Sequence, residues 1–236
     1  MKTRKSNITI AVALAGFFLL VTIPGAVAQE QDWEFEVVPY MWAAGIGGTT
    51  ASGGDIDIGF DDILDNLDIA LMSTFEARKG KWSFLTDVIY MDLDNDSSTL
   101  DVGMQSWIVT PALGYNLIRE ENFKLDILGG ARFLWLKAEV QPAGGPRLSD
   151  SGDVWDGIVG LKGELNLSKN WSMPFCLDVG AGNSNSTWQA MGGLAYKLKK
   201  CDVLMGYRYL DWDFDDNNVF SDLNISGPYA GIKIPF

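Results

Sequence analysis

The side chains that most often catalyse reactions near neutral pH are scarce in this chain. Its 236 residues include no histidine. Histidine titrates near neutrality and is the commonest general base, so its absence excludes Ser–His and Asp–His arrangements. Carboxylates are plentiful, with 31 aspartate and glutamate residues, but no pair is distinguished by its spacing. The sequence therefore predicts no catalytic residue and no enzyme activity.

Two acidic segments are the next candidates, for metal binding. In LDWDFDDNNVFSD, residues 210–222, the carboxylates have spacings similar to those of a calcium loop. Asp216 stands where the EF-hand loop needs glycine, and no helices flank the segment, so we interpret it as a solvated hairpin end. DIDIGFDDILDNLD, residues 55–68, is expected to form a short amphipathic turn near the bilayer surface. We predict no metal site and no cofactor, although acidic loops can together hold divalent cations that bridge lipopolysaccharide phosphates.

The N-terminal segment has the layout of a secretory signal peptide. Three basic residues precede an apolar run from Ile8 to Ile23, and the small residues 26–28 fit a cleavage site. We therefore predict a signal peptide over residues 1–28 and a mature domain over 29–236.

Removing three of the 18 basic residues leaves 15 against 31 acidic ones, a net charge of −16, which excludes nucleic acid as a partner. An exported chain meets an oxidising compartment, so a disulfide between Cys176 and Cys201 is possible, and the sequence leaves it open.

The rest of the chain alternates apolar and polar residues with period two, which indicates β-strands. Short links such as KGK and LSKN alternate with longer polar ones, as in membrane β-barrels. Strands of up to about sixteen residues exceed the usual soluble length. We predict a closed antiparallel transmembrane β-barrel of ten strands, with eight or twelve as alternatives. The barrel must close because hydrocarbon offers no hydrogen-bond partner, so every backbone group has to be paired within the protein. The ten runs lie near residues 33–46, 67–78, 82–94, 99–116, 122–138, 154–167, 171–182, 187–198, 202–213 and 223–236.

Aromatic residues on the apolar faces gather near the strand ends, where membrane barrels carry interfacial girdles. Aromatic core filling is the alternative interpretation. The predicted girdle residues are Trp33, Trp82, Tyr115, Phe123, Trp135, Trp155, Trp171, Trp188 and Tyr196.

The last strand carries the chain's most specific resemblance. Ala230, Ile232, Ile234 and Phe236 alternate up to the terminal aromatic residue, and with the signal peptide and the amphipathic strands they make the chain resemble Gram-negative outer-membrane β-barrel proteins. The resemblance implies that this strand is read by the barrel-assembly machinery and pairs with the first strand. The segments WEFEVVPYMWAAGIGG, DDILDNLD and FEARKGKW are also similar to a group of uncharacterised proteobacterial outer-membrane proteins, which implies no activity. Pro235 departs from the pattern at a position usually free, and costs one ladder hydrogen bond at most.

The enzymes among small outer-membrane barrels, by the same resemblance, use a histidine that this chain lacks. Alternation instead places charges of both signs in the lumen, either as a packed ion-pair network or as a narrow polar conduit favouring cations. We expect a non-enzymatic barrel, structural or narrow-pore, in the outer membrane. The alternative is a surface-binding or adhesion module using loops 48–66, 139–153 and 214–222; an envelope-lipid enzyme is less favoured. The predicted lumen residues are Glu34, Glu36, Glu76, Arg78, Asp87, Lys124, Asp126, Arg132, Lys162, Glu164, Asp178 and Arg208.

The expected partners are those of the cell envelope. They are outer-membrane lipid, lipopolysaccharide and the barrel-assembly machinery. The termini are expected in the periplasm and the long loops outside. The sequence leaves open the solute, the oligomeric state and the physiological role.

Overall fold

The computed structural model describes residues 32–50, 53–65, 67–95, 100–142, 148–214 and 220–236. The predicted signal peptide lies outside these residues and stays a prediction. No helix in the described part of the chain is long and apolar enough to cross a membrane. The elements are β1 (Glu34–Trp42), β2 (Gly45–Thr50), β3 (Asp55–Ile58), α1 (Phe60–Asp65), β4 (Leu67–Lys79), β5 (Trp82–Asn95), β6 (Leu100–Arg119), β7 (Phe123–Pro142), β8 (Leu148–Asn166), β9 (Trp171–Gly182), β10 (Ser186–Lys197), β11 (Asp202–Asp213) and β12 (Phe220–Pro235).

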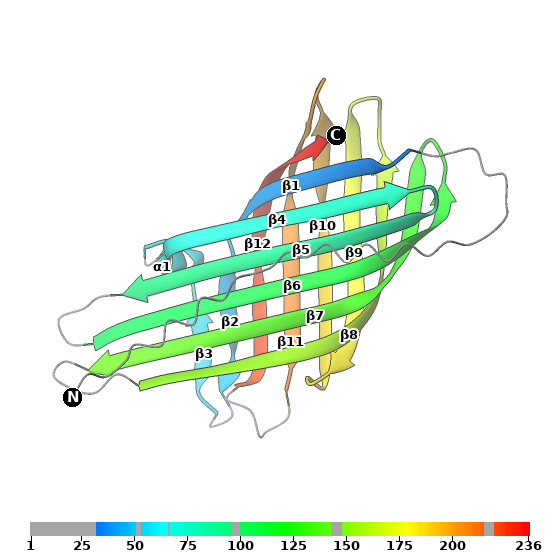
Figure 1. The fold of residues 1–236 in the computed structure, drawn as a ribbon. Coiled ribbons are helices and arrows are strands. Elements are labelled where there is room, and N and C mark those ends of the chain that lie inside the picture. The colour runs from blue at the N-terminus through cyan, green and yellow to red at the C-terminus, as the bar shows by residue number, and fades with distance from the viewer. Residues whose placement is uncertain (1–31, 51–52, 66, 96–99, 143–147, 215–219) are drawn as a thin grey trace, which may run out of the picture. The chain divides into compact units, whose positions relative to one another are not determined.

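Ten of these strands form a closed antiparallel barrel, which confirms the predicted fold (Figure 1). The ring runs from β1 through β4 and each following strand to β12, which pairs with β1 again. Alternation along the strands builds it: on β7, Asp126, Leu128 and Arg132 are buried while Ile127 between them is exposed. Each ring strand thus pairs with a neighbouring strand on both sides, as hydrocarbon requires.

Short turns join the strands at one end of the barrel, which we call the turn end; the opposite end is the loop end. The turn between β4 and β5 holds only two residues, Gly80 and Lys81. Gly80 has a φ of 62°, a left-handed conformation that residues with a Cβ rarely adopt and that tight hairpins need. Asp202 and Lys233, which pair across β11 and β12, lie at the same end.

The barrel closes through Phe35 and Phe236. The Phe35 amide donates to the Phe236 carbonyl over 3.2 Å, and the Phe236 amide donates back over 3.0 Å. The two rings stack with centroids 5.7 Å apart. Pro235, which has no N–H, faces Glu36 in the register. Ala230, Ile232, Ile234 and Phe236 are all exposed on the outer surface; their reading by the assembly machinery stays a prediction.

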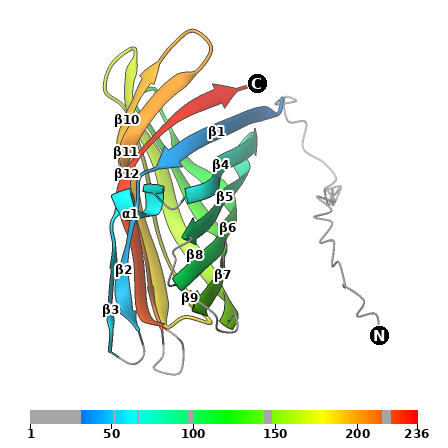
Figure 2. The ribbon, with the colours of Figure 1, turned by 90° about the vertical axis from the view of Figure 1, so that its left-hand side faces the viewer.

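The first predicted strand, residues 33–46, is in fact two strands. β1 ends at Trp42, and β2 continues beside β12 and also pairs with β3. β12 has 16 residues and β1 has nine, so β2 pairs with the part of β12 that β1 leaves open. β4 pairs with β1 only up to Ser73, and α1 lies between β2 and β4 along the chain (Figure 2).

Two further expectations at the loop end need correction. Most of segments 139–153 and 48–66 belongs to β7, β8, β2, β3 and α1, because backbone pairing continues past the amphipathic pattern whatever the side chains are. The expected turn near the bilayer surface is α1, but its Ile63 is 5% exposed and packs against the inward-facing Trp42 cluster. Part of the acidic segment 210–222, residues 215–219, lies outside the described residues.

The outer surface is apolar. Large hydrophobic side chains such as Leu113, Val159 and Met205 are more than half exposed there, which suits lipid. Aromatic residues contact one another across neighbouring strands at both ends, as in Trp82–Tyr115 at the turn end, with centroids 4.9 Å apart. The other such contacts are Trp171–Tyr196 at the turn end, and Phe133–Trp155, Trp188–Tyr209 and Tyr90–Trp107 farther toward the loop end.

The predicted girdle residues lie on this outer face. Trp33, Trp82, Trp155, Trp171 and Trp188 are exposed, and the other four are half-buried. Their placement at membrane interfaces stays a prediction.

Candidate functional site: the barrel lumen

A cavity of about 240 Å³ lies inside the barrel, lined by residues of all ten ring strands. Of the twelve predicted lumen residues, Arg132 is buried without lining the cavity, and Glu34 lies at the exposed turn end. The ten that line it are Glu36, Glu76, Arg78, Asp87, Lys124, Asp126, Lys162, Glu164, Asp178 and Arg208.

Ion pairs cross the lumen between strands that are not neighbours. Arg78 of β4 bonds Glu76 over 2.7 Å and also bonds Asp126 of β7. Lys162 of β8 reaches back to Glu76. Asp126 accepts a further bond of 2.6 Å from the Asn116 side-chain amide. These contacts tie β4, β6, β7 and β8 together through the interior.

A second group of contacts centres on Arg208 of β11, whose side chain is 3% exposed. Its guanidinium pairs with Asp87 of β5 over 2.8 Å, and donates to the Tyr40 hydroxyl over 2.8 Å and to Gln189 over 2.9 Å. Tyr40 in turn donates to Asp87 over 2.8 Å, as does Thr74 over 2.9 Å. The Arg208 charge is therefore compensated and its donors are well occupied, as a buried guanidinium requires.

Arg132 of β7 is wholly buried and pairs with Asp178 of β9 over 2.6 Å. It also donates to the Thr187 hydroxyl over 2.9 Å. Gln189 donates to the second oxygen of Asp178 over 2.9 Å and so joins this pair to Arg208. We call these connected contacts, together with those around Arg78, the lumen network.

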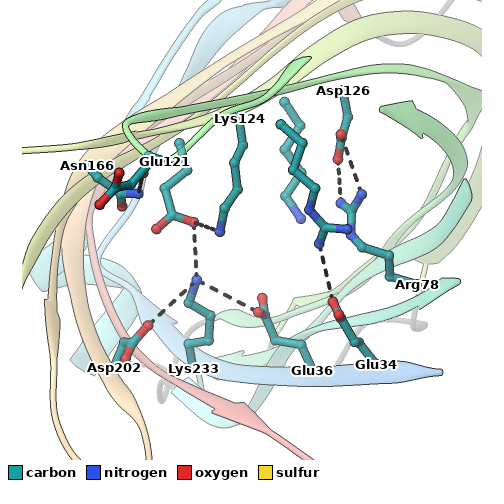
Figure 3. A network of polar contacts seen from close by, with 12 residues as sticks. Glu34, Glu36, Arg78, Glu121, Lys124, Asp126, Asn166, Asp202 and Lys233 are labelled. Carbon is teal, nitrogen blue, oxygen red and sulfur yellow. Dashed lines mark hydrogen bonds and ion pairs between the residues drawn. The ribbon is translucent and has the colours of Figure 1, made fainter. Parts of the chain in front are cut away.

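Toward the turn end the charges become exposed. Lys233 lies between Glu36, Glu164 and Asp202 at 3.6–3.7 Å; Figure 3 shows its Nζ reaching toward Glu36 and Asp202. Glu34 pairs with Arg119 over 3.3 Å, but both side chains are largely in solvent. Side-chain exposure falls from 46% at Lys124 to 3% at Arg208, so the cavity opens at the turn end.

Toward the loop end the lumen is filled by apolar side chains, which we call the apolar plug. Leu210 and Trp212 are 0% exposed, and Ile89 is 1% exposed. The guanidinium of Arg132 lies 5.9 Å from the Trp212 ring, where network and plug meet. The plug consists of Trp42, Ala44, Ile46, Ile63, Met72, Ile89, Met91, Ile108, Leu134, Leu210, Trp212, Phe214, Leu223 and Ile225.

Sequence reasoning passed over the uncharged members of the network. Tyr40, Thr74 and Gln189 make direct contacts with its charged groups. The alternation along their strands also predicts that these three side chains face inward, but the predicted lumen residues were chosen by charge alone. Lys233 of β12 also lies in the lumen.

The site offers little for bond-making chemistry. Among the described residues no group of three cysteines, aspartates or glutamates is placed to hold a metal ion. Cys176, buried in the cavity wall, and Cys201 are both free thiols. The lining carries six carboxylates and five basic groups, a near balance that weakens the expected preference for cations.

Comparisons with known proteins assign no family to this chain. No protein-family model matches the chain, and no curated protein does. Solved structures that match include Ail, the attachment invasion locus protein of Yersinia pestis (13% identity, 88% of this chain and 100% of that one, TM-score 0.42). The outer membrane protease OmpT of Escherichia coli matches at 9% identity, over 89% of this chain and 99% of that one, with a TM-score of 0.47. Neisserial surface protein A matches at 15% identity, over 89% and 100%, with a TM-score of 0.34. These are Gram-negative outer-membrane β-barrels, and at such identities no activity follows from the likeness.

Proposed function

We propose that this outer-membrane β-barrel is a non-enzymatic structural protein whose lumen does not conduct. The observation that carries the proposal is the apolar plug. Leu210 and Trp212 of β11 and Ile89 of β5 are at most 1% exposed, so water does not reach the inner wall at their level. A barrel of about eight strands has an interior just wide enough for side chains to fill, and ten strands enlarge it only slightly.

The lumen network supports the same proposal from the other side of the plug. Its ion pairs connect opposite walls, from β4 to β8 and from β5 to β11. Each pair holds two strands at a fixed separation, and breaking one leaves an uncompensated buried charge. Such cross-braces stiffen a barrel that serves as a rigid part of the envelope, in contact with lipid and lipopolysaccharide.

The non-enzymatic part of the proposal rests on the state of the ionisable groups. The chain has no histidine, and two carboxylates of the cavity wall, Asp87 and Asp178, are each paired with an arginine. A carboxylate committed to a buried ion pair is a poor general base, because accepting a proton would break the pair.

Single-channel recording of the refolded mature protein in planar lipid bilayers tests the proposal. We expect no conductance steps from the wild type. A Leu210→Ala, Trp212→Ala double variant removes the two most buried plug side chains and is expected to conduct. The control is Leu161→Ala, a residue on the lipid-facing side of β8; it should stay silent. Reproducible ion-selective steps from the wild type would overturn the closed lumen and restore the narrow-pore alternative.

A further inference from the structure

Exposed basic side chains concentrate at the turn end of the barrel. Among the described residues, Lys137 is the only basic residue that lies toward the loop end; the others lie inside the barrel or are exposed in and beside the short turns. Of the four short turns, the one after β6 carries Glu120 and Glu121, and the other three carry lysine and no carboxylate. In a chain with 31 acidic and 18 basic residues, composition alone does not predict such a concentration.

Two of the lysine-bearing turns lie side by side. The turn after β8 holds Lys169, and the turn after β10 holds Lys199 and Lys200. The Lys197 amide at the end of β10 donates to the Asn170 carbonyl of the other turn over 2.8 Å, which joins the two turns directly. We call Lys169, Lys199 and Lys200 the basic patch.

The basic patch has no counter-ion within the described part of the protein. All three lysine side chains are exposed, and none forms an ion pair with another described residue. Asp202, the carboxylate that follows them in the chain, is directed instead toward Lys233, 3.7 Å away (Figure 3). The patch therefore presents three uncompensated positive charges to its surroundings.

Apolar side chains adjoin the basic patch in the same two turns. Leu167 and Leu198 are 52% and 47% exposed, although a turn in water usually carries polar residues. Directly beside them, the rings of Trp171 and Tyr196 lie 4.8 Å apart on the outer surface. Such an aromatic pair on an apolar barrel wall is typical of the level where lipid headgroups begin.

We propose that the basic patch is a docking surface for anionic phospholipids. The lysines attract the headgroup phosphates, and the acyl chains lie against the two leucines and the apolar wall of β9 and β10. The ligand is a layer of headgroups, so the three lysines need not converge on one atom. Uncompensated charge beside apolar surface fits an amphipathic anion better than a soluble one.

The predicted orientation places the turn end in the periplasm, where the neighbouring leaflet consists of phospholipid. We therefore assign the patch to phospholipid and not to lipopolysaccharide. The proposal is independent of whether the lumen conducts.

The experiment compares two lipids that differ only in the headgroup. The mature protein is refolded in detergent and titrated with dioleoyl phosphatidylglycerol, or with dioleoyl phosphatidylcholine, which has no net charge. Native mass spectrometry counts the bound lipid and gives an apparent dissociation constant for each. We expect the wild type to bind phosphatidylglycerol at least about tenfold more tightly, since each lysine near a membrane surface contributes about fivefold. Raising the ionic strength should reduce this preference.

Variants with matched changes of charge locate the binding surface. The Lys199→Gln, Lys200→Gln double variant should bind phosphatidylglycerol about tenfold more weakly and phosphatidylcholine unchanged. The control is Lys79→Gln, Lys81→Gln, which removes the same charge from the turn after β4 and should change the affinity by less than about twofold. Lys199→Arg, Lys200→Arg keeps the charge and should keep the affinity. Circular dichroism checks the folding of each variant.

Four results would overturn the proposal. The first is equal binding of the two lipids by the wild type. The second is an equal loss in both glutamine double variants, which would assign the preference to net charge. The third is tighter binding of lipid A than of phosphatidylglycerol, which would assign the patch to lipopolysaccharide. The fourth is displacement of phosphatidylglycerol by glycerol phosphate, which has no acyl chains and would indicate a soluble ligand. Conductance of the wild type would overturn the proposed function and leave this assay unaffected.

Discussion

The lumen network and the apolar plug meet within two residues along a strand. On β5, Asp87 is bonded to Arg208, and the next inward residue, Ile89, is packed in the plug. On β11, Arg208 is followed in the same way by Leu210. Both regions occupy the interior, but the network surrounds a cavity and is held by directional bonds, whereas the plug consists of densely packed apolar side chains.

The difference between the two regions concerns what happens when one partner is lost. A buried ion pair adds little net stability compared with an apolar pair of the same volume, yet removing one partner is strongly destabilising. A packed apolar region loses stability in proportion to the atoms removed. The network therefore fixes which strands face each other, and the plug provides most of the burial energy of the interior.

The largest effect is expected when a charge is moved into the plug. Ile89→Asp places a carboxylate at a position that is 1% exposed and surrounded by apolar side chains. We expect a loss of about 5 kcal/mol or more, because the charge has neither water nor a partner. Guanidinium unfolding of the refolded protein in lipid vesicles measures it. Ile89→Leu is the matched control and should cost less than about 1.5 kcal/mol; equal losses would show that packing alone decides the site.

A somewhat smaller effect is expected when a charge is taken out of the network. Asp178→Ala leaves Arg132 buried without its counter-ion, and we expect a loss of about 3–5 kcal/mol in the same unfolding assay. Asp178→Asn keeps the shape and one acceptor oxygen, so it should retain the bond from Gln189 or that from Arg132. A loss with asparagine that is much smaller than with alanine would argue that the charge itself is not needed, whereas equal losses would assign the whole effect to the charge.

The smallest effect is expected at the exposed mouth. Glu34→Gln removes the partner of Arg119, but the two side chains are 69% and 43% exposed. Solvent screens such a pair, and we expect a change below about 1 kcal/mol. A loss comparable to that of Asp178→Ala would contradict the distinction between buried and exposed pairs.

The sequence predicted the fold well because the barrel repeats one local rule. Period two assigned Asp126 and Arg132 to the interior and Ile232 to the exterior, and the structure has them there. Whether a side chain points inward or outward depends only on its position in the alternation, and not on which residues it meets across the barrel. It also explains why the strand count of ten was within reach.

Features that depend on the register between strands could not be predicted from the sequence. Which carboxylate meets Arg78 depends on how far β4 and β7 are shifted across the lumen, and local alternation does not contain that shift. The alternation predicts that Trp42 and Trp212 face inward. The predicted lumen residues were chosen by charge, however, so the apolar plug was not predicted. The split of the first strand follows from the excess length of β12, which only pairing reveals.

The closing pair between Phe35 and Phe236 has a consequence for the order of folding events. Hairpins such as β4–β5 join residues that are neighbours in the chain, so they can form early and independently. Phe35 and Phe236 lie at opposite ends of the described chain, and bringing them together costs the most loop entropy of any contact. Ring closure is therefore expected to be the last and slowest step, and an incompletely closed barrel would expose the edges of β1 and β12 until it occurs.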